Sequence, residues 1–213
     1  MTQDTPTMSS KSVQSSNLGF GVDVGGSGIK GAVVDLDTGE LVGERIKILT
    51  PQPSTPDSVA ATVAEIAEQA EWSGPVGVTL PSVLMGGVVR TAANIDSSWI
   101  GTDAHELFTG ALGRQDVSIL NDADAAGIAE DRFGAAKDTG GVVILLTFGT
   151  GIGSAVLHNG VLLPNTEFGH MEIGGREAEH IAASSVKDKL GLSYKQWAKE
   201  VSRVLEHYEA LLW

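Results

Sequence analysis

The stretch LGFGVDVGGSGIKGAVVDL at residues 18–36 joins two apolar runs through a glycine-rich turn. Residues 26–31 fit the spacing G-x-G-x-x-G, which in a dinucleotide-binding fold opens directly into a helix. Here a strand-like run, 32–36, follows instead, and then the turn signal Asp-Thr-Gly-Glu at 37–40. We therefore interpret the stretch as a β-hairpin that continues into a third strand over 41–49. A P-loop is excluded as well, because no Ser or Thr follows the lysine.

Beyond this hairpin, the sequence predicts alternating helices and strands. Apolar residues recur at helical spacing over 58–71. We also predict helices over 105–112, 123–133, which is rich in alanine, 177–189 and 194–212. We place the N-cap of the first helix at Asp57. Short apolar runs predict strands over 75–80, 117–120, 141–148 and 152–157, and Gly86-Gly87 marks a turn. The result is a mixed α/β order, which the opening hairpin distinguishes from a strictly alternating βαβ protein.

Composition excludes several classes of function. The chain has 213 residues, with 27 Asp and Glu against 14 Lys and Arg, so its net charge is −13. This balance argues against nucleic-acid binding, which needs a basic surface. There is no cysteine, which removes disulfides, thiol nucleophiles and Cys-ligated zinc. The polar residues 1–17 lack the apolar segment of a secretory signal, and we expect them to be a disordered tail. No apolar run in the sequence reaches the ~20 residues of a membrane span. We therefore expect a cytoplasmic protein.

Two glycine clusters, one in each half of the chain, indicate phosphate binding. Backbone N–H groups in such turns can approach phosphate oxygens without hindrance from a Cβ atom. Taken alone, either cluster is equally an ordinary β-turn. Together they suit a phosphate chain held between two lobes. The candidate residues are Asp23, Gly25, Gly26, Ser27, Gly28 and Lys30 in the first cluster, and Gly149, Thr150 and Gly151 in the second.

The segment Asn121-Asp122-Ala-Asp124 follows a predicted strand and opens a helix. A carboxylate at a helix N-terminus is stabilised by the helix dipole, so either aspartate is explained as a simple cap. The functional alternative is a general base, which accepts the proton of a substrate hydroxyl as a phosphoryl group arrives. The residues alone leave both interpretations open.

A third group of polar residues includes Glu167, His170, Glu179 and His180. A metal site is conceivable, but no third ligand occurs at tight spacing in the sequence, and cysteine is absent. We favour recognition of a polyol, because carboxylates and an imidazole form paired hydrogen bonds with adjacent sugar hydroxyls. The Asn94 amide, in a predicted loop, suits the same task.

These motifs, in this order, resemble the ROK family of sugar kinases. The resemblance implies an α/β, actin-like ATPase (ribonuclease-H-like) fold with lobes over 18–120 and 121–213. It implies that the two glycine turns hold phosphates, that Asp122 is the base on the sugar 6-hydroxyl, and that Asp23 lies near Mg²⁺ through water. It also implies a homodimer and contacts to glucose or mannose. The contact residues would be Asn94, Asn121, Asp122, Glu167, His170 and Glu179.

Two departures from the family pattern refine this expectation. Residues 171–176 stand where many ROK proteins carry a Cys-rich zinc loop, so we expect no zinc. The short form is similar to the polyphosphate glucokinases of actinobacteria, which implies inorganic polyphosphate as donor and leaves ATP open. The family usually continues into a Gly-rich segment that contacts adenine. We therefore expect the C-terminal lobe to be truncated at Trp213.

Two alternatives to a kinase stay open at this point. The chain is an inactive sugar-binding fragment if a missing segment is needed to close the site. A sugar-responsive ROK regulator is the other alternative, but such proteins carry a helix-turn-helix of several dozen residues, and the 17-residue tail is too short and too polar for one. For polyphosphate, the sequence offers Arg90, Arg132, Lys137 and Arg176 as candidate cations without placing them in space.

Overall fold

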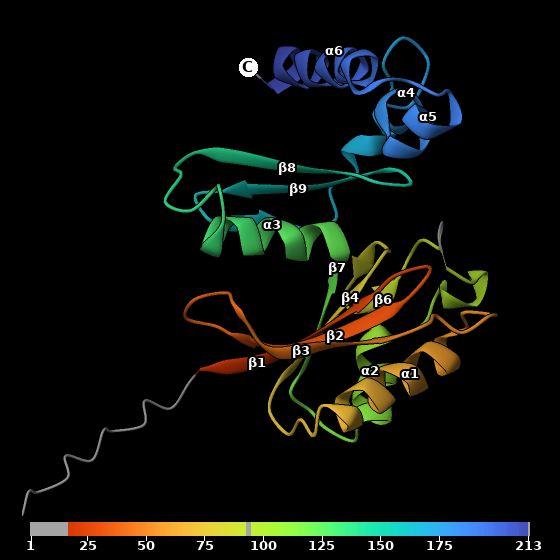
Figure 1. The fold of residues 1–213 in the computed structure, drawn as a ribbon, viewed down its shortest axis with the longest axis vertical. Coiled ribbons are helices and arrows are strands. Elements are labelled where there is room, and N and C mark those ends of the chain that lie inside the picture. Colours follow the sequence, from red (N-terminus) through yellow and green to blue (C-terminus); the bar gives the residue numbers. More distant parts are fainter. Residues whose placement is uncertain (1–16, 93–94, 213) are drawn as a thin grey trace, which may run out of the picture.

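The computed structural model describes residues 17–92 and 95–212, which form two main β-sheets with helices packed against them (Figure 1). The N-terminal sheet has the strand order β3-β2-β1-β4-β7. The pairs β1–β2 and β2–β3 are antiparallel, whereas β1–β4 and β4–β7 are parallel. This confirms the opening hairpin and the third strand. The bounds are β1 Leu18–Val24, β2 Ile29–Asp35, β3 Leu41–Ile48, β4 Val76–Leu80 and β7 Val117–Asn121.

One face of this sheet is covered by α1 (Pro56–Gln69) and α2 (Ala104–Leu112). Alternate strand residues point into this core, so Val22 of β1 and Val78 of β4 are each 1% exposed. Ile66 of α1 is fully buried among them. The other face of the sheet carries the intervening residues, which include glycines, polar side chains and a few apolar ones such as Val34 and Leu120, and it is open toward α3 (Asp122–Phe133).

The expected N-cap of the first helix was wrong. The helix begins two residues earlier, because Pro56 occupies its first position and the side chain of Thr55 accepts from Ser58 N at 3.4 Å. Asp57 lies in the first turn instead, where its charge still favours the helix N-terminus.

The second sheet is antiparallel, with the order β10-β9-β8. Its strands are β8 Val142–Phe148, β9 Ile152–His158 and β10 Val161–Leu163. Helix α3 packs closely on it, because a Cβ on Gly127 would lie only 2.5 Å from Cβ of Ala155 in β9. In Figure 1 α3 runs between the two sheets. A second core, which includes Ile181 and Tyr208, joins this sheet to α6 (Tyr194–Leu212).

The single helix expected over 177–189 is two short helices, α4 (Glu179–Ala182) and α5 (Ser184–Lys189). The chain is extended at Ala183, with ψ 152°. The break is explained by long-range hydrogen bonds: Ser185 donates through Oγ to the Thr150 carbonyl at 2.6 Å and through its backbone N to the Gly149 carbonyl at 3.1 Å.

The remaining elements are short. The turn at Gly86-Gly87 is confirmed as a hairpin of β5 (Leu84–Met85) and β6 (Val88–Val89), and two 3₁₀ turns are η1 (Ser97–Trp99) and η2 (Phe168–His170). Most of the tail expected to be disordered, residues 1–16, and the loop residue Asn94 lie outside the described residues. Within the described residues, no helix combines the length and the apolar character needed to cross a bilayer.

Candidate active site

The carboxyl ends of β1, β4 and β7 meet at one edge of the N-terminal sheet, because these strands are parallel neighbours. Asp23 lies near the end of β1, and Asp122 follows β7 directly. Ligands of parallel sheets bind at this edge. In Figure 1 the β8–β9 turn and the N-terminal end of α3 lie on the side toward which β1 runs. The topology therefore brings both glycine turns and the candidate base to one side of the molecule.

The first glycine turn is closed by backbone hydrogen bonds. The Gly25 N–H donates to the Gly28 carbonyl at 3.2 Å, and the Thr50 hydroxyl donates to the Gly25 carbonyl at 2.5 Å. A Cβ on Gly25 would lie 3.0 Å from that Gly28 oxygen, so the close approach favours glycine. The end of β3 is thereby tied to the turn.

Asp23 is held from two sides beside this turn. Its Oδ1 accepts from the Thr79 hydroxyl and its Oδ2 from the Lys30 ammonium, both at 3.2 Å. The side chain is 50% exposed. A fixed carboxylate next to a hydroxyl oxygen and open to water fits Mg²⁺, which keeps several waters and takes few protein ligands.

Asp122 is the first residue of α3, and its Oδ1 accepts from the Ala123 N–H at 2.9 Å. The capping role belongs to Asn121, whose Oδ1 accepts from Asp124 N at 3.0 Å. Burial raises the pKa of Asp122 above its ordinary 3.8; the Ala123 N–H opposes this rise, and the negative charge of Asp23 adds to it. The side chain remains accessible to solvent, as a base that meets a substrate must be.

Asp124 has a different environment from Asp122. It is 1% exposed, and its Oδ2 accepts from Asn165 N at 2.8 Å, which ties α3 to the segment before Glu167. Its other oxygen has no partner among the described residues. Burial raises its pKa and the Asn165 N–H lowers it. Of the two candidate bases, Asp122 is therefore the accessible one and Asp124 a buried anchor.

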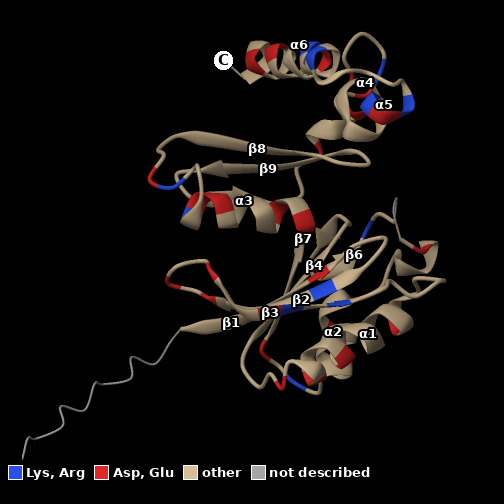
Figure 2. Ribbon diagram, in the orientation of Figure 1, with Lys and Arg blue, Asp and Glu red and all other residues tan. Residues whose placement is uncertain are grey.

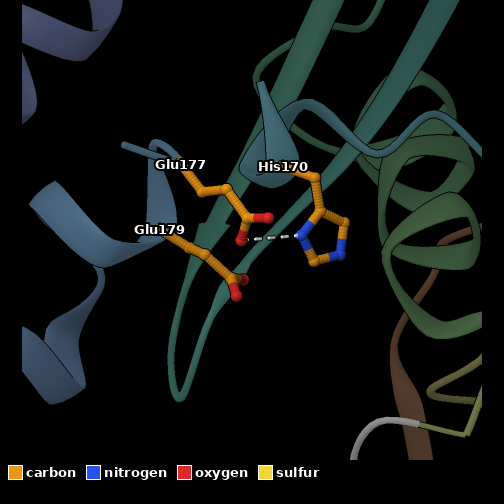
Figure 3. Close-up of side chains that lie close together, drawn as sticks. All are labelled: His170, Glu177 and Glu179. Carbon is orange, nitrogen blue, oxygen red and sulfur yellow. Dashed lines mark hydrogen bonds and ion pairs between the residues drawn. The ribbon is translucent and has the colours of Figure 1, made fainter. Parts of the chain in front are cut away.

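Figure 3 shows the cluster around His170, in which the His170 ring faces the carboxylate of Glu177. The His170 Nδ1 lies 3.3 Å from Glu177 Oε2, and its Nε2 lies 3.9 Å from Glu167 Oε2. Glu179 lies beside them, and His170, Glu177 and Glu179 offer ligand atoms within 4.8 Å of one another. The oxygen and nitrogen atoms of this cluster can ligate a cation or form hydrogen bonds with several sugar hydroxyls.

Glu167 connects this cluster electrostatically to Asp122. Burial raises the pKa of Glu167, His170 lowers it, and the charges of Asp122, Asp124 and Glu179 raise it further. The geometry agrees, because the hydrogen bond from Asn165 N to Asp124 Oδ2 holds the segment before Glu167 against the first turn of α3. The cluster around His170 and the base at the start of α3 therefore belong to one site.

The second glycine turn touches the same site through Glu179. Glu179 Oε2 accepts from Ile152 N at 3.3 Å, and a Cβ on Gly151 would overlap this oxygen. The Gly149 N–H donates to the Gly151 carbonyl at 2.9 Å and closes the turn. A candidate sugar ligand thus packs directly against a candidate phosphate turn.

Comparison with known proteins places this site in a family. The ROK family pattern matches residues 19–184. The chain belongs to the ROK family. It is 64% identical over 195 residues to a polyphosphate glucokinase of Mycobacterium tuberculosis strain H37Rv, covering 92% of this chain and 74% of that protein. It is 60% identical over 208 residues to a polyphosphate glucokinase of Mycobacterium leprae, covering 96% of this chain and 64% of that protein.

Solved ROK structures have the same actin-like fold. The inorganic polyphosphate/ATP-glucomannokinase from Arthrobacter sp. strain KM superposes with a TM-score of 0.85 at 46% identity, over 91% of this chain and 79% of that one. A ROK glucokinase from Streptomyces griseus, solved with glucose and AMPPNP, superposes with a TM-score of 0.70 at 26% identity, over 81% and 59% of the two chains. The resemblance to ROK sugar kinases and the expected fold class are confirmed.

The ROK site does not use all the expected residues in the same way. Asn121 is 8% exposed; besides capping α3, its Nδ2 donates to the Ser82 carbonyl at 3.2 Å, so the protein itself occupies both ends of the amide. Arg176 donates to the His180 carbonyl at 2.6 Å. A sugar contact by Asn121 and a phosphate contact by Arg176 remain predictions.

Sequence reasoning missed two side chains of this ROK site. Thr79 pairs in register with Asp23 across β1 and β4, so its alternation within the predicted strand would have placed it on the same face. Glu177 carries no comparable signal. It reaches His170 because an isolated bridge pairs it with Glu172, a contact that local spacing does not predict.

Proposed function

We propose that this chain is a glucokinase that transfers the terminal phosphate of inorganic polyphosphate to the 6-hydroxyl of glucose. The observation that carries the proposal is Asp122: an accessible carboxylate at the carboxyl edge of a parallel sheet, near both a glycine turn and a cluster with sugar-binding donors. Its mycobacterial relatives are named as polyphosphate glucokinases at 60–64% identity, which supports the choice of donor and acceptor.

In the proposed reaction Asp122 accepts the proton of the 6-hydroxyl as that oxygen bonds to the terminal phosphorus. The bond from this phosphorus to the bridging oxygen breaks, and the shortened polyphosphate leaves with the electron pair. The N–H groups of the two glycine turns and the Lys30 ammonium hold the donor oxygens. Magnesium near Asp23, when bound, neutralises charge that develops on the phosphates.

Glu167, His170 and Glu179 are proposed to bind the hexose hydroxyls and so to hold the 6-hydroxyl beside Asp122. The Glu177 carboxylate accepts from His170 Nδ1, which fixes the ring and leaves Nε2 toward Glu167 and the sugar. The Arthrobacter neighbour is named as a polyphosphate/ATP-glucomannokinase, which supports ATP as a second donor and mannose as a second acceptor. A homodimer, a cytoplasmic location and a site without zinc remain predictions.

Substitution of the base tests this function. Asp122→Asn should lower kcat for glucose 6-phosphate formation by roughly 10²- to 10⁴-fold, because the amide cannot accept the proton. Glucose binding, measured by calorimetry, should stay within a few-fold of wild type. Asp57→Asn, the same change at an exposed position of α1, is the control and should leave kcat unchanged.

Two outcomes would overturn the proposal. Retained turnover in Asp122→Asn would remove this residue from the role of base. A wild-type chain that binds glucose but forms no product with polyphosphate or ATP would identify it as a sugar-binding protein without kinase activity.

A further inference from the structure

Three cations lie on the open face of the N-terminal sheet, close to the first glycine turn. Lys30 of β2 and Lys47 of β3 are directly opposite each other in register, so both side chains leave the sheet on the same side. Arg45 precedes Lys47 by two residues on β3 and lines the same open face. Figure 2 shows Lys and Arg positions gathered on β2 and β3, in a chain of net charge −13.

The repulsion between these neighbouring cations destabilises the sheet when no anion is bound. Like charges that face each other across two strands destabilise a sheet. Lys30 is compensated by Asp23 at 3.2 Å. Within residues 17–92 and 95–212, no carboxylate lies within 4.0 Å of the charged groups of Lys47 or Arg45. Both side chains are exposed and available to an external anion.

A cavity of about 380 Å³ lies over this face, and two of the three cations, Lys30 and Arg45, line it. Asp23, Lys30 and Thr79 line it at the edge, and Arg45 lines it farther along the sheet. Small residues form part of its floor, and Ala125 of α3 contributes from the other side; the floor residues include Gly21, Ala32 and Gly77. The cavity therefore extends over the open face of the sheet from Asp23 and Lys30 to Arg45.

Lys47 reaches the glycine turn itself. A Cβ on Gly28 would lie 2.8 Å from Cε of Lys47, so the aliphatic stem of the lysine crosses the space that glycine leaves open. This brings its ammonium beside the turn that is proposed to hold donor phosphates. Arg45 lies about 6.8 Å farther back along the strand, at about 3.4 Å per residue.

We propose that Lys30, Lys47 and Arg45 form a basic stripe that binds the polyphosphate chain behind the phosphate being transferred. The inference rests on the proposed function and assigns the donor subsite. Because the cations follow one another along the sheet, a long polyphosphate contacts all three, whereas a short phosphate chain contacts those nearest the turn. The stripe therefore selects donors by chain length.

The test compares a stripe variant with a matched charge control. The stripe variant is Lys47→Gln with Arg45→Gln. The control is Lys195→Gln with Arg203→Gln, two exposed cations of α6. Binding of long-chain sodium polyphosphate and of tripolyphosphate is measured by calorimetry at several salt concentrations. Thermal unfolding of each variant confirms that it folds.

The stripe variant should bind long-chain polyphosphate about tenfold or more weakly for each lost cation. The salt dependence of log Kd should become less steep by about 0.7–0.9 per lost phosphate contact. Tripolyphosphate should be affected less, and the control variant should match wild type. Equal affinity of the stripe and control variants for long-chain polyphosphate, equal losses for both probes, or no polyphosphate binding by the wild type would each overturn the stripe.

Glucose phosphorylation assayed in parallel separates this inference from the proposed function. If the wild-type chain forms no glucose 6-phosphate but the stripe variant still loses long-chain binding, the kinase function fails and the stripe stands. If the wild-type chain is active and the stripe variant keeps its KM for long-chain polyphosphate, the stripe alone fails.

Discussion

Asp122 must be ionised to act as a base, yet its surroundings disfavour the charge. Burial and the negative charge of Asp23 raise its pKa above 3.8. Activity should therefore be lost as the pH falls through a value higher than 3.8. The measurement is kcat/KM for glucose against pH, with folding checked at each pH by circular dichroism.

A substitution beside Asp122 tests whether this residue causes the loss of activity at low pH, the acid limb of the pH profile. Asp23→Asn removes a neighbouring negative charge, so the limb should move to lower pH although the maximal rate also falls. Glu167→Gln should retain a limb, because Glu167 is assigned to the sugar and not to the proton. A limb that moves upward in Asp23→Asn, or disappears in Glu167→Gln, would contradict the assignment.

At this scale the sequence predicts residues whose role follows from a local position. The local context, after a strand and at the start of a helix, marks both Asp122 and Asp124 as a cap or a base, and the resemblance to the ROK family singles out Asp122. The buried contacts of Asn121 with Ser82, and of Asp124 with Asn165, join segments 39 and 41 residues apart. No spacing rule predicts these anchoring contacts, and the sugar contact by Asn121, which the resemblance to the ROK family implies, stays a prediction.

At the scale of the element, the β8–β9 turn offers two glycines with opposite surroundings. A Cβ on Gly151 would overlap Glu179 Oε2, whereas a Cβ on Gly149 would meet nothing within 4 Å. Gly151→Ala should displace the Glu179 carboxylate and raise the KM for glucose by about tenfold, the equivalent of one lost charged hydrogen bond. Gly149→Ala should leave glucose binding at the wild-type level. Equal glucose affinities in the two variants would show that Glu179 does not bind the sugar.

The elements themselves were largely predictable, because period-2 alternation and turn chemistry are local signals. The first strand of the opening hairpin and helix α6 were found at their observed bounds, whereas β2 begins at Ile29, three residues before the predicted run. The break between α4 and α5 was not, since Ser185 satisfies carbonyls of the β8–β9 turn. A helical pattern continues through Ala183 in sequence, and the competing contacts come from 35 residues away.

At the scale of the whole molecule, the part of the chain that the structure describes contains two hydrophobic cores that share no residue. One lies between the N-terminal sheet and helices α1 and α2, the other between the second sheet and α4 to α6. The strand β7 pairs with β4 in the first sheet, whereas α3, which follows directly, packs on β9. We propose that the boundary between lobes 18–120 and 121–213 lies at this junction and that each lobe unfolds as its own unit.

A matched pair of core substitutions tests the two units. Ile66 is fully buried in the first core and Ile181 is 4% exposed in the second. Each Ile→Ala change should cost about 2–5 kcal/mol of the free energy of unfolding of its own lobe. Native-state hydrogen exchange should then show lost protection in β1 and β4 for Ile66→Ala, and in β9 for Ile181→Ala. The amides of α3 should follow β9 although their chain neighbours in β7 follow β4, because packing and not sequence adjacency sets the cooperative unit. If both variants lose protection equally throughout, the two cores unfold together and the boundary at Asn121 is not a thermodynamic one.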